Sequence, residues 1–229
     1  MPIQAIVTDI EGTTTEIQFV SQVLFPYAAA ALPDFIRQNQ HRADVAEQLR
    51  QVRHQIQQPE AELELVISSL LHWIDTDQKI TPLKELQGLI WARGYQSGQL
   101  KGQLYPDVAP ALKHWQQQGK ALYVYSSGSV AAQRLLFGYS VEGDLTGLFQ
   151  GYFDTHTGGK KDSASYQRIA AELSLPAAEI LFLSDHPDEI LAAQAAGWHC
   201  IQLLRDGQYS ALQPQATDFI QVNQLLEAL

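Results

Sequence analysis

The sequence has little cysteine, little positive charge and no long apolar run. Its one cysteine, Cys200, excludes a disulfide within the chain and a zinc site built from several cysteines, and its apolar neighbours predict a small buried side chain. Lysine and arginine number 15 against 25 aspartates and glutamates, so the formal net charge of −10 argues against nucleic acid or an anionic membrane as a partner. No stretch contains the about 20 apolar residues that are needed to cross a bilayer.

What is present is the composition of an ordinary globular protein. The chain has 229 residues, of which 45% are apolar and 17% charged, enough for one sizeable core with an inserted second unit. Its first residues enter a short strand-like run without a basic segment or a cleavage site. We therefore expect a cytoplasmic protein, and the lack of an obvious pairing helix favours a monomer.

Short, continuous apolar runs predict strands that are buried on both faces of a parallel sheet. Four runs are strong and a fifth is weaker. They span residues 3–9, 121–127, 179–185, 200–204 and, as the weaker one, 218–222. Helical stretches at 109–119 and 165–175 lie between them, which indicates an α/β architecture with crossover helices.

The region from about residue 20 to residue 100 has a different pattern, in which apolar residues repeat at helical spacing. The repeats are Val45, Leu49, Val52 and Ile56, followed by Leu63, Val66, Ile67, Leu70, Leu71 and Ile74. Thr81 and Pro82 predict the N-cap and first position of a further helix. The glycine-rich segment 94–108 is expected to be the return hinge. We therefore predict an α/β core from residues 1–18 and 102–229, with an all-helical domain at 19–101.

Each strong strand is followed by polar residues that can carry chemistry. They are Asp9, Glu11, Gly12 and Thr13 after the first strand, Ser126 and Ser127 after the second, Lys160 and Lys161 on a later glycine-rich loop, and Asp185 and Glu189 after the third. Taken singly, each group has an ordinary explanation as a helix cap, a polar turn or a solvated lysine pair. Ligands bind at the carboxyl ends of parallel strands, however, so we expect these groups to converge on one site.

Together these groups have the chemistry of phosphoryl transfer. Asp9 and Asp185 can supply oxygen ligands to Mg²⁺, which usually takes one or two carboxylates with water and phosphate. The Asp9 carboxylate can then attack phosphorus and form an aspartyl-phosphate. Ser126 and backbone N–H groups of the first loop can hold the phosphoryl oxygens, while Lys160 neutralises charge. Glu11, on the same side of an extended chain as Asp9, can serve as general acid and then as general base.

These motifs resemble the haloacid dehalogenase superfamily of aspartate-nucleophile phosphatases, and the helical insertion resembles the helical cap of that superfamily. The expected fold is therefore its Rossmann-like parallel-sheet core with an inserted all-helical cap. Most members carry a second aspartate where this chain has Glu11. The sequence DIEGTTT, with glutamate at that place, resembles the enolase-phosphatase (acireductone synthase) branch of methionine salvage. The likeness continues through LFPY, GYQSGQLKGQLYPDV, YSSGS, FDT with the lysine loop, and FLSD.

The resemblance implies a Mg²⁺-dependent enzyme acting on 2,3-diketo-5-methylthiopentyl-1-phosphate. The enzyme would enolise this small diketone phosphate and then remove phosphate, which leaves the acireductone 1,2-dihydroxy-3-keto-5-methylthiopentene. A metal that polarises a carbonyl acidifies the neighbouring C–H group, so one site can serve both steps.

The resemblance also implies roles for individual residues. Asp9 would be nucleophile and metal ligand, Glu11 a metal ligand through its carbonyl and an acid/base through its side chain, and Asp185 the second metal carboxylate. Glu189 would either hold a metal-bound water or be a plain acid at a helix start. The remaining assignments are contacts with substrate or phosphate, and they fall on Gly12, Thr13, Ser126, Ser127 and Lys160. The spacing to Ser165 and Tyr166 selects Lys160 over Lys161.

Seven further residues have both a functional and an ordinary interpretation. Phe19, Phe25, Trp91 and Tyr95 either line a pocket for the methylthio tail or form the core of the helical region. His156 and His186 lie near the chemistry but can equally be bystanders on loops. Lys101 either meets the substrate or faces solvent, and for all seven the ordinary interpretation carries more weight.

Two other functions compete with the enolase-phosphatase interpretation. A monofunctional phosphatase of the same superfamily would act on another small phosphate ester, and the glutamate in the first motif argues against it. A signalling receiver module also uses a phospho-aspartate, a hydroxyl residue and a lysine. Receivers are about half as long, lack a helical insertion and carry the phosphorylated aspartate later in the chain.

Overall fold

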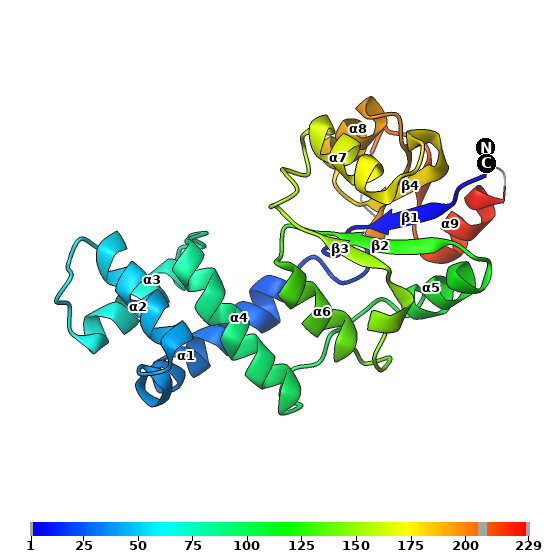
Figure 1. Ribbon diagram of the computed structural model, residues 1–229. Coiled ribbons are helices and arrows are strands. Elements are labelled where there is room, and N and C mark those ends of the chain that lie inside the picture. Colours follow the sequence, from blue (N-terminus) through cyan, green and yellow to red (C-terminus); the bar gives the residue numbers. More distant parts are fainter. Residues whose placement is uncertain (1, 206–209, 228–229) are drawn as a thin grey trace. The chain divides into compact units, whose positions relative to one another are not determined.

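The computed structural model describes residues 2–205 and 210–227, and its central feature is a six-stranded sheet (Figure 1). The strand order is β3-β2-β1-β4-β5-β6, and every neighbouring pair is parallel. The strands are β1 (Ala5–Thr8), β2 (Ala121–Tyr125), β3 (Gly151–Phe153), β4 (Ile180–Ser184), β5 (His199–Leu203) and β6 (Gln215–Ala216). The predicted α/β fold with a parallel sheet is confirmed, as are the four strong strands.

Helices cover both faces of this sheet because successive side chains of a buried strand point to opposite sides. The helices of this part are α5 (Val108–Gln117), α6 (Val130–Gly138), α7 (Ser163–Leu173), α8 (Pro187–Ala195) and α9 (Phe219–Leu226), with short 3₁₀ turns η2 (Thr146–Leu148) and η3 (Ala177–Glu179). Ala5 and Val7 of β1 belong to a buried cluster with Tyr166 of α7 and Ile190 of α8. Helix α5 packs against β2 and α9 (Figure 1).

The chain divides into two compact units, Met1–Phe19 with Lys101–Leu229, and Val20–Leu100. Each boundary of this division lies one residue from the boundary expected from the sequence. Within Val20–Leu100, every described element is helical, as predicted. The elements are the π-helix η1 (Val20–Leu24), α1 (Phe25–Asn39), α2 (Ala43–Gln55), α3 (Leu63–Asp75) and α4 (Thr81–Gln96).

The helical unit has its own apolar core, to which the predicted repeats contribute. Val45, Leu49 and Val52 of α2 are buried there with Val66 and Leu70 of α3. A core of its own is what allows such a unit to fold as an insertion. In the described parts of the chain, none of the helices is both long and apolar enough to traverse a membrane.

The predicted strand at 218–222 is wrong, because that segment begins helix α9. The Asp218 carboxylate accepts a hydrogen bond from the Gln221 N–H group at 2.8 Å and so caps the helix. Phe219 and Val222, three residues apart, are both buried, and the Phe219 ring packs against Trp115 at 5.2 Å between centroids. The sheet edge on this side is instead the two-residue strand β6.

The start of α4 also differs from its prediction by one position. Ile80 is the N-cap, Thr81 is the first helical residue and Pro82 is the second, and no side chain caps this helix end. Proline is still accommodated, since the N–H groups of the first turn have no partner within the helix.

Candidate active site

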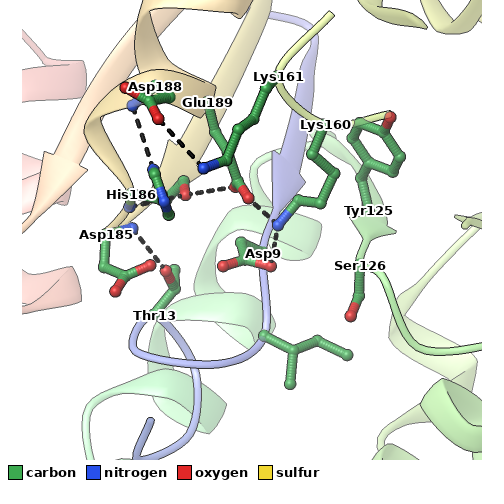
Figure 2. A network of polar contacts seen from close by, with 12 residues as sticks. Asp9, Thr13, Tyr125, Ser126, Lys160, Lys161, Asp185, His186, Asp188 and Glu189 are labelled. Carbon is green, nitrogen blue, oxygen red and sulfur yellow. Dashed lines mark hydrogen bonds and ion pairs between the residues drawn. The ribbon is translucent and has the colours of Figure 1, made fainter. Parts of the chain in front are cut away.

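Strands β1 and β4 place Asp9 and Asp185 at the same edge of the sheet (Figure 2). Thr8 is in register with Leu183, and the Asp9 N–H group donates to the Leu183 carbonyl at 2.8 Å. Asp9, the first residue after β1, therefore lies beside Ser184, the last residue of β4, and Asp185 follows Ser184 directly. Two carboxylates that are 176 positions apart in the sequence thus share one site, as expected for the carboxyl ends of neighbouring parallel strands.

Lys160 reaches into this site from the loop after β3 and binds two carboxylates (Figure 2). Its ammonium group forms ion pairs with Asp9 Oδ1 and, at 2.7 Å, with Glu189 Oε2. The three side chains are 8%, 6% and 10% exposed, so this is a buried cluster with one cation and two anions. Buried charges require such pairing, because removing an ion from water is costly.

Two tyrosines hold the Lys160 loop in place. The Tyr125 hydroxyl donates to the Gly158 carbonyl at 2.9 Å, and the Tyr166 hydroxyl donates to the Lys160 carbonyl at 2.6 Å. Tyr166 is fully buried and packs edge-on against the Tyr125 ring, so the loop is anchored to the sheet core. Neither tyrosine was singled out from the sequence, although Tyr166 belongs to the SY pair that was used to choose between the lysines.

Glu189 accepts a hydrogen bond from the Ser184 hydroxyl at 2.8 Å in addition to its ion pair with Lys160. These contacts fix the carboxylate at the start of α8, with its side chain directed toward the strand ends (Figure 2). The Glu189 carboxylate is thus a partner of the lysine. Its expected contact with a metal-bound water stays a prediction.

The carboxylates of the cluster have perturbed acidity. Burial raises the pKa of Asp9, and the nearby Glu189 charge adds to this effect while Lys160 opposes it. Burial and the negative charges of Asp9 and Glu189 raise the pKa of Asp185 to about 7. Burial by itself would lower the pKa of Lys160, but its two carboxylate partners more than offset this and raise it. The site therefore has an excess of negative charge that a cation can neutralise.

The turn after β1 is closed by its own hydrogen bonds. Gly12 has a φ angle of +74°, which favours glycine, and its N–H group donates to the Thr15 carbonyl at 2.8 Å. The Thr13 N–H group donates to the Ile10 carbonyl at 3.2 Å. These two N–H groups would have to exchange partners to bind a phosphoryl oxygen, so that role stays a prediction. Glu11 pairs through its backbone with Thr15 and is half-buried.

The Thr13 side chain connects the two strand ends. Its hydroxyl oxygen accepts a hydrogen bond from the Asp185 N–H group at 3.0 Å (Figure 2). Thr13 is fully buried. The turn that follows Asp9 is therefore bonded directly to the loop that carries the second carboxylate.

The loop after β2 presents two serines differently. Ser126 is buried and its hydroxyl accepts from the Gly128 N–H group at 3.2 Å, while Ser127 is exposed. Asp154, which the sequence analysis did not single out, accepts from the Val130 N–H group at 3.2 Å at the start of α6. It thereby joins the loop after β3 to the loop after β2. The three-residue strand β3 was too short to reveal this connection.

The weaker candidates outside the helical unit have local contacts or are exposed to solvent. His186 caps α8 by accepting from the Asp188 N–H group at 3.2 Å, and the His156 side chain is 92% exposed. Lys161 is 59% exposed and pairs with Asp188 at 3.1 Å, in contrast to the buried Lys160. Lys101 is exposed.

The four aromatic candidates all pack within their own units. Phe19 is buried with the residues of the α/β unit, and Tyr95 is buried in α4. Phe25 and Trp91 stack at 6.4 Å between centroids, and the Trp91 indole N–H group donates to the Leu24 carbonyl at 2.9 Å. The burial of Phe19 and Tyr95 and the contacts of Phe25 and Trp91 indicate packing roles, so the contact with a methylthio tail stays a prediction.

The acidity of Asp185 predicts how stability depends on pH without divalent ions. Its pKa in the folded protein, about 7, lies above its ordinary value of 3.8. The folded state therefore binds this proton more tightly than the unfolded state does. The stabilisation that the bound proton gives the folded state is lost as pH rises through 7. In EDTA we expect the free energy of unfolding to fall by about 2 kcal/mol between pH 5 and pH 8, which allows for partial solvent screening. Urea titrations followed by circular dichroism measure it.

The control for this prediction is Asp185→Asn, which removes the titrating group but keeps its shape. We expect the variant to have a flatter dependence of stability on pH over the same range, since Lys160 stays charged throughout it. Parallel curves for the wild type and Asp185→Asn would contradict the proposed origin of the effect.

The donor set at the strand ends is compatible with a hard divalent cation. In the stretches 2–205 and 210–227, no group of three or more histidine, cysteine, aspartate or glutamate side chains is arranged to hold a metal. Magnesium does not require such a group, because it usually takes one or two carboxylates and completes its shell with water and substrate oxygens. Asp9 and Asp185 supply the two carboxylates of this lower requirement, and a contact from the Glu11 carbonyl stays a prediction.

Comparisons with known proteins show the family of the chain. Residues 3–197 match the family of haloacid dehalogenase-like hydrolases. The chain is 56% identical to the enolase-phosphatase E1 of Erwinia tasmaniensis over 98% of both chains, and 55% identical to that of Serratia proteamaculans over 96% of this chain and 97% of the relative. The crystal structure of the UTR4 protein from Saccharomyces cerevisiae superposes with a TM-score of 0.81 at 34% identity, covering 94% of this chain and 98% of that one.

Solved haloacid dehalogenases have the same fold at lower identity. The 2-haloacid dehalogenase of Pseudomonas syringae pv. Tomato matches with a TM-score of 0.63 at 19% identity, over 99% of each chain. The family match over most of the chain and the high identity over nearly its full length lead to one assignment. The chain belongs to the haloacid dehalogenase-like hydrolases and, within them, to the enolase-phosphatase E1 family.

Proposed function

We propose that this protein is a bifunctional, Mg²⁺-dependent enolase-phosphatase of methionine salvage. Its substrate would be 2,3-diketo-5-methylthiopentyl-1-phosphate, and its products the acireductone 1,2-dihydroxy-3-keto-5-methylthiopentene and phosphate. The observation that carries the proposal is the buried Lys160 ammonium between Asp9 and Glu189, with Asp185 beside them. An enzyme of this class needs such an arrangement of nucleophile, cation and second carboxylate at one sheet edge.

Asp9 and Asp185, with the Glu11 carbonyl, would hold Mg²⁺. Burial raises the pKa of both carboxyl groups, and negative charge adds to it, from Glu189 at Asp9 and from Asp9 and Glu189 at Asp185, so a divalent cation relieves an unfavourable charge there. When bound, the cation supplies charge neutralisation at the phosphate and polarisation of the substrate carbonyl.

In the phosphatase half of the reaction, the Asp9 carboxylate attacks phosphorus and forms an aspartyl-phosphate. Lys160 offsets the negative charge that accumulates around the phosphoryl group. Glu11 first protonates the leaving oxygen and then takes a proton from the water that hydrolyses the intermediate. Ser126 and Ser127 contact the phosphoryl group or the substrate from the loop after β2.

In the enolase half, a base must remove a proton from the carbon next to a substrate carbonyl. The carboxylates of the site have the required chemistry, since burial and like charges bring the acidity of such groups nearer to neutral pH. The single site then serves both steps, because the enediol that forms carries the same phosphate ester.

The test follows both products with the purified protein and Mg²⁺. We expect the diketone phosphate to give the enediol absorbance and inorganic phosphate in equal amounts, and we expect EDTA to stop phosphate release. Phosphate release from generic esters without turnover of the diketone phosphate would support a monofunctional phosphatase instead. A phospho-protein stable for minutes, without turnover, would support a signalling receiver.

The proposal includes the surroundings in which the enzyme works. We infer a cytoplasmic monomer that acts on a small molecule, in line with the net charge of −10, and residues 19–101 as its helical cap. Analytical ultracentrifugation at micromolar concentration tests the oligomeric state. Sedimentation as a dimer would contradict the monomer.

The turn at Gly12 provides a mutational prediction for the proposed site. A Cβ atom there would overlap Asp185 Oδ2, and the φ angle of +74° disfavours any other residue. We therefore expect Gly12→Ala to displace the Asp185 carboxylate and lower kcat by about 100-fold, with a loss of about 1–3 kcal/mol in stability. Steady-state kinetics and urea unfolding measure the two effects.

Gly119→Ala is the matched control for this substitution. Gly119 has a similar φ angle of +79°, but an added Cβ atom there meets no other atom within 4 Å. This variant should lose about 1 kcal/mol of stability through backbone strain and keep its activity. Equal kcat values for the two variants would show that the overlap with Asp185 is not what matters.

A further inference from the structure

Arg205 is a buried cation that has no role in the reaction described so far. It is 6% exposed and forms an ion pair with Asp107, whose side chain is 12% exposed. Its guanidinium group lies over the ring of Tyr105, 4.2 Å from the centroid, and 5.3 Å from that of Phe219. A cation that is enclosed in this way needs partners for its N–H groups.

All five N–H groups of Arg205 donate hydrogen bonds. Two bonds go to Asp107, Nη1 to Oδ1 at 3.0 Å and Nη2 to Oδ2 at 2.9 Å, which is the bidentate geometry that arginine favours. Another goes from Nη1 to the Thr217 carbonyl at 3.3 Å. The remaining two converge on the Thr13 carbonyl, from Nε at 3.2 Å and from Nη2 at 2.9 Å.

Thr13 is the residue that joins the two halves of the catalytic site. Its carbonyl accepts from Arg205, while its hydroxyl accepts from the Asp185 N–H group at 3.0 Å. The turn between Asp9 and Thr13 is therefore fixed at its far end by a buried guanidinium group. Through Thr13, Arg205 is thereby linked to the backbone at Asp185 as well as to the turn after Asp9.

Asp107 in turn fixes the direction of the guanidinium group. Besides its two bonds to Arg205, its Oδ2 atom accepts from the Phe219 N–H group at 2.8 Å. Two neighbouring contacts reinforce the same turn, since the Tyr105 N–H group donates to the Thr14 carbonyl at 3.0 Å and the Thr15 hydroxyl to the Gln103 carbonyl at 2.5 Å. The segment before α5 thus holds Thr14 and Thr15, which follow the turn, and also holds Arg205.

We propose that Arg205, oriented by Asp107, is a positioning residue that sets the geometry of the Asp9–Thr13 turn relative to Asp185. This proposal rests on the proposed phosphatase function. Arginine is required because lysine has only three donors and cannot form the bidentate pair while also bonding the Thr13 carbonyl twice. A small displacement of the turn then slows the chemical step, because misplacing reacting groups by about 1 Å lowers the rate by on the order of 100-fold.

The test compares Arg205→Lys with the wild type in kinetics and in the binding of orthovanadate, a mimic of the phosphoryl-transfer transition state. We expect kcat to fall by about 10–100-fold with KM changed by less than about threefold. The Kd of orthovanadate, measured by calorimetry with Mg²⁺, should rise by a similar factor, whereas that of inorganic phosphate should change little.

The control is Asn223→Ala, which weakens the packing of α5 against α9 without touching the turn. The Asn223 side chain accepts from the Trp115 indole N–H group. We expect its Tm to fall while kcat and the orthovanadate Kd stay within about twofold of the wild type. If Arg205 had only a structural role, Arg205→Lys would likewise lower the Tm and leave kcat and the orthovanadate Kd within about twofold of the wild type. That result would overturn the proposal.

Two further measurements keep the proposal decisive. If Arg205→Lys does not fold, Asp107→Asn takes its place, because asparagine retains one acceptor for Arg205 but cannot form the bidentate pair. A kcat and an orthovanadate Kd of Asp107→Asn that equal those of the wild type would overturn the proposal. In the double variant with Thr13→Val, the effects should be less than additive if Arg205 acts through Thr13, and additivity contradicts it. Orthovanadate binding is independent of turnover, so a wild type that binds it but leaves the diketone phosphate unchanged would refute the substrate alone.

Discussion

Replacing Asp9 by asparagine is expected to lower the rate of phosphate release by about 10⁴-fold or more while the protein stays folded. An amide has no anionic oxygen with which to attack phosphorus, so the covalent step is lost. The fold is retained because asparagine keeps the shape of the side chain and its Oδ1 atom can still accept from Lys160. The lysine also keeps its second partner, Glu189, at 2.7 Å. Phosphate release at saturating substrate and urea unfolding measure the two quantities.

Asp188→Asn is the matched control for this experiment. Asp188 is also an acid near the strand ends, but it is 58% exposed and pairs with the exposed Lys161. We expect its activity to stay within about twofold of the wild type and its stability within about 0.5 kcal/mol, since exposed ion pairs contribute little. An Asp9→Asn variant that releases phosphate at more than about one per cent of the wild-type rate would exclude Asp9 as the nucleophile.

Much of the site was open to prediction because of how parallel sheets are built. Strands β1, β2 and β4 have four or five residues that are apolar except for the last residue of β1 and of β4, and each strand is followed at once by polar residues. Once the sheet is taken as parallel, Asp9, Ser126 and Asp185 must emerge at the same edge. The strand order did not have to be known for this, because all carboxyl ends lie on one side.

The parts of the fold that escaped prediction are short or ambiguous in pattern. Strand β3 has three residues and β6 has two, which is too few for an apolar period to be recognised. The segment 218–222 has apolar residues that suit a strand or a helix equally well. The hydrogen bond from the Gln221 N–H group to the Asp218 carboxylate favours the helix. This bond depends on the local backbone conformation rather than on composition.

The contacts that complete the site could not be derived from the sequence because they are long-range. Glu189 reads as an acid in the first turn of a helix, and only the structure shows that it shares Lys160 with Asp9. The bonds from Arg205 to Thr13 join residues 192 positions apart. Spacing patterns describe neighbours on one helix or strand, whereas such pairs depend on how several loops come together.

Removing the Lys160 ammonium is expected to affect stability and activity together. In Lys160→Met, the buried carboxylates of Asp9 and Glu189 lose their shared cation. We expect a loss of about 3–5 kcal/mol in the free energy of unfolding, the usual cost of leaving a buried charge unpaired. We also expect kcat to fall by about 10²–10³-fold, because the charge on the phosphoryl group is no longer offset. Urea unfolding in EDTA and steady-state kinetics with Mg²⁺ measure these effects.

A second substitution separates the structural from the catalytic contribution of Lys160. In Lys160→Met combined with Glu189→Gln, one of the two unpaired anions is gone, so about half of the lost stability should return while kcat stays low. Lys161→Met is the neighbouring control, since that side chain is 59% exposed, and it should change stability by less than about 0.5 kcal/mol. Recovery of kcat in the double variant would mean that Lys160 only keeps the acidic cluster folded, and an equal loss in Lys161→Met would show that burial does not distinguish the two lysines.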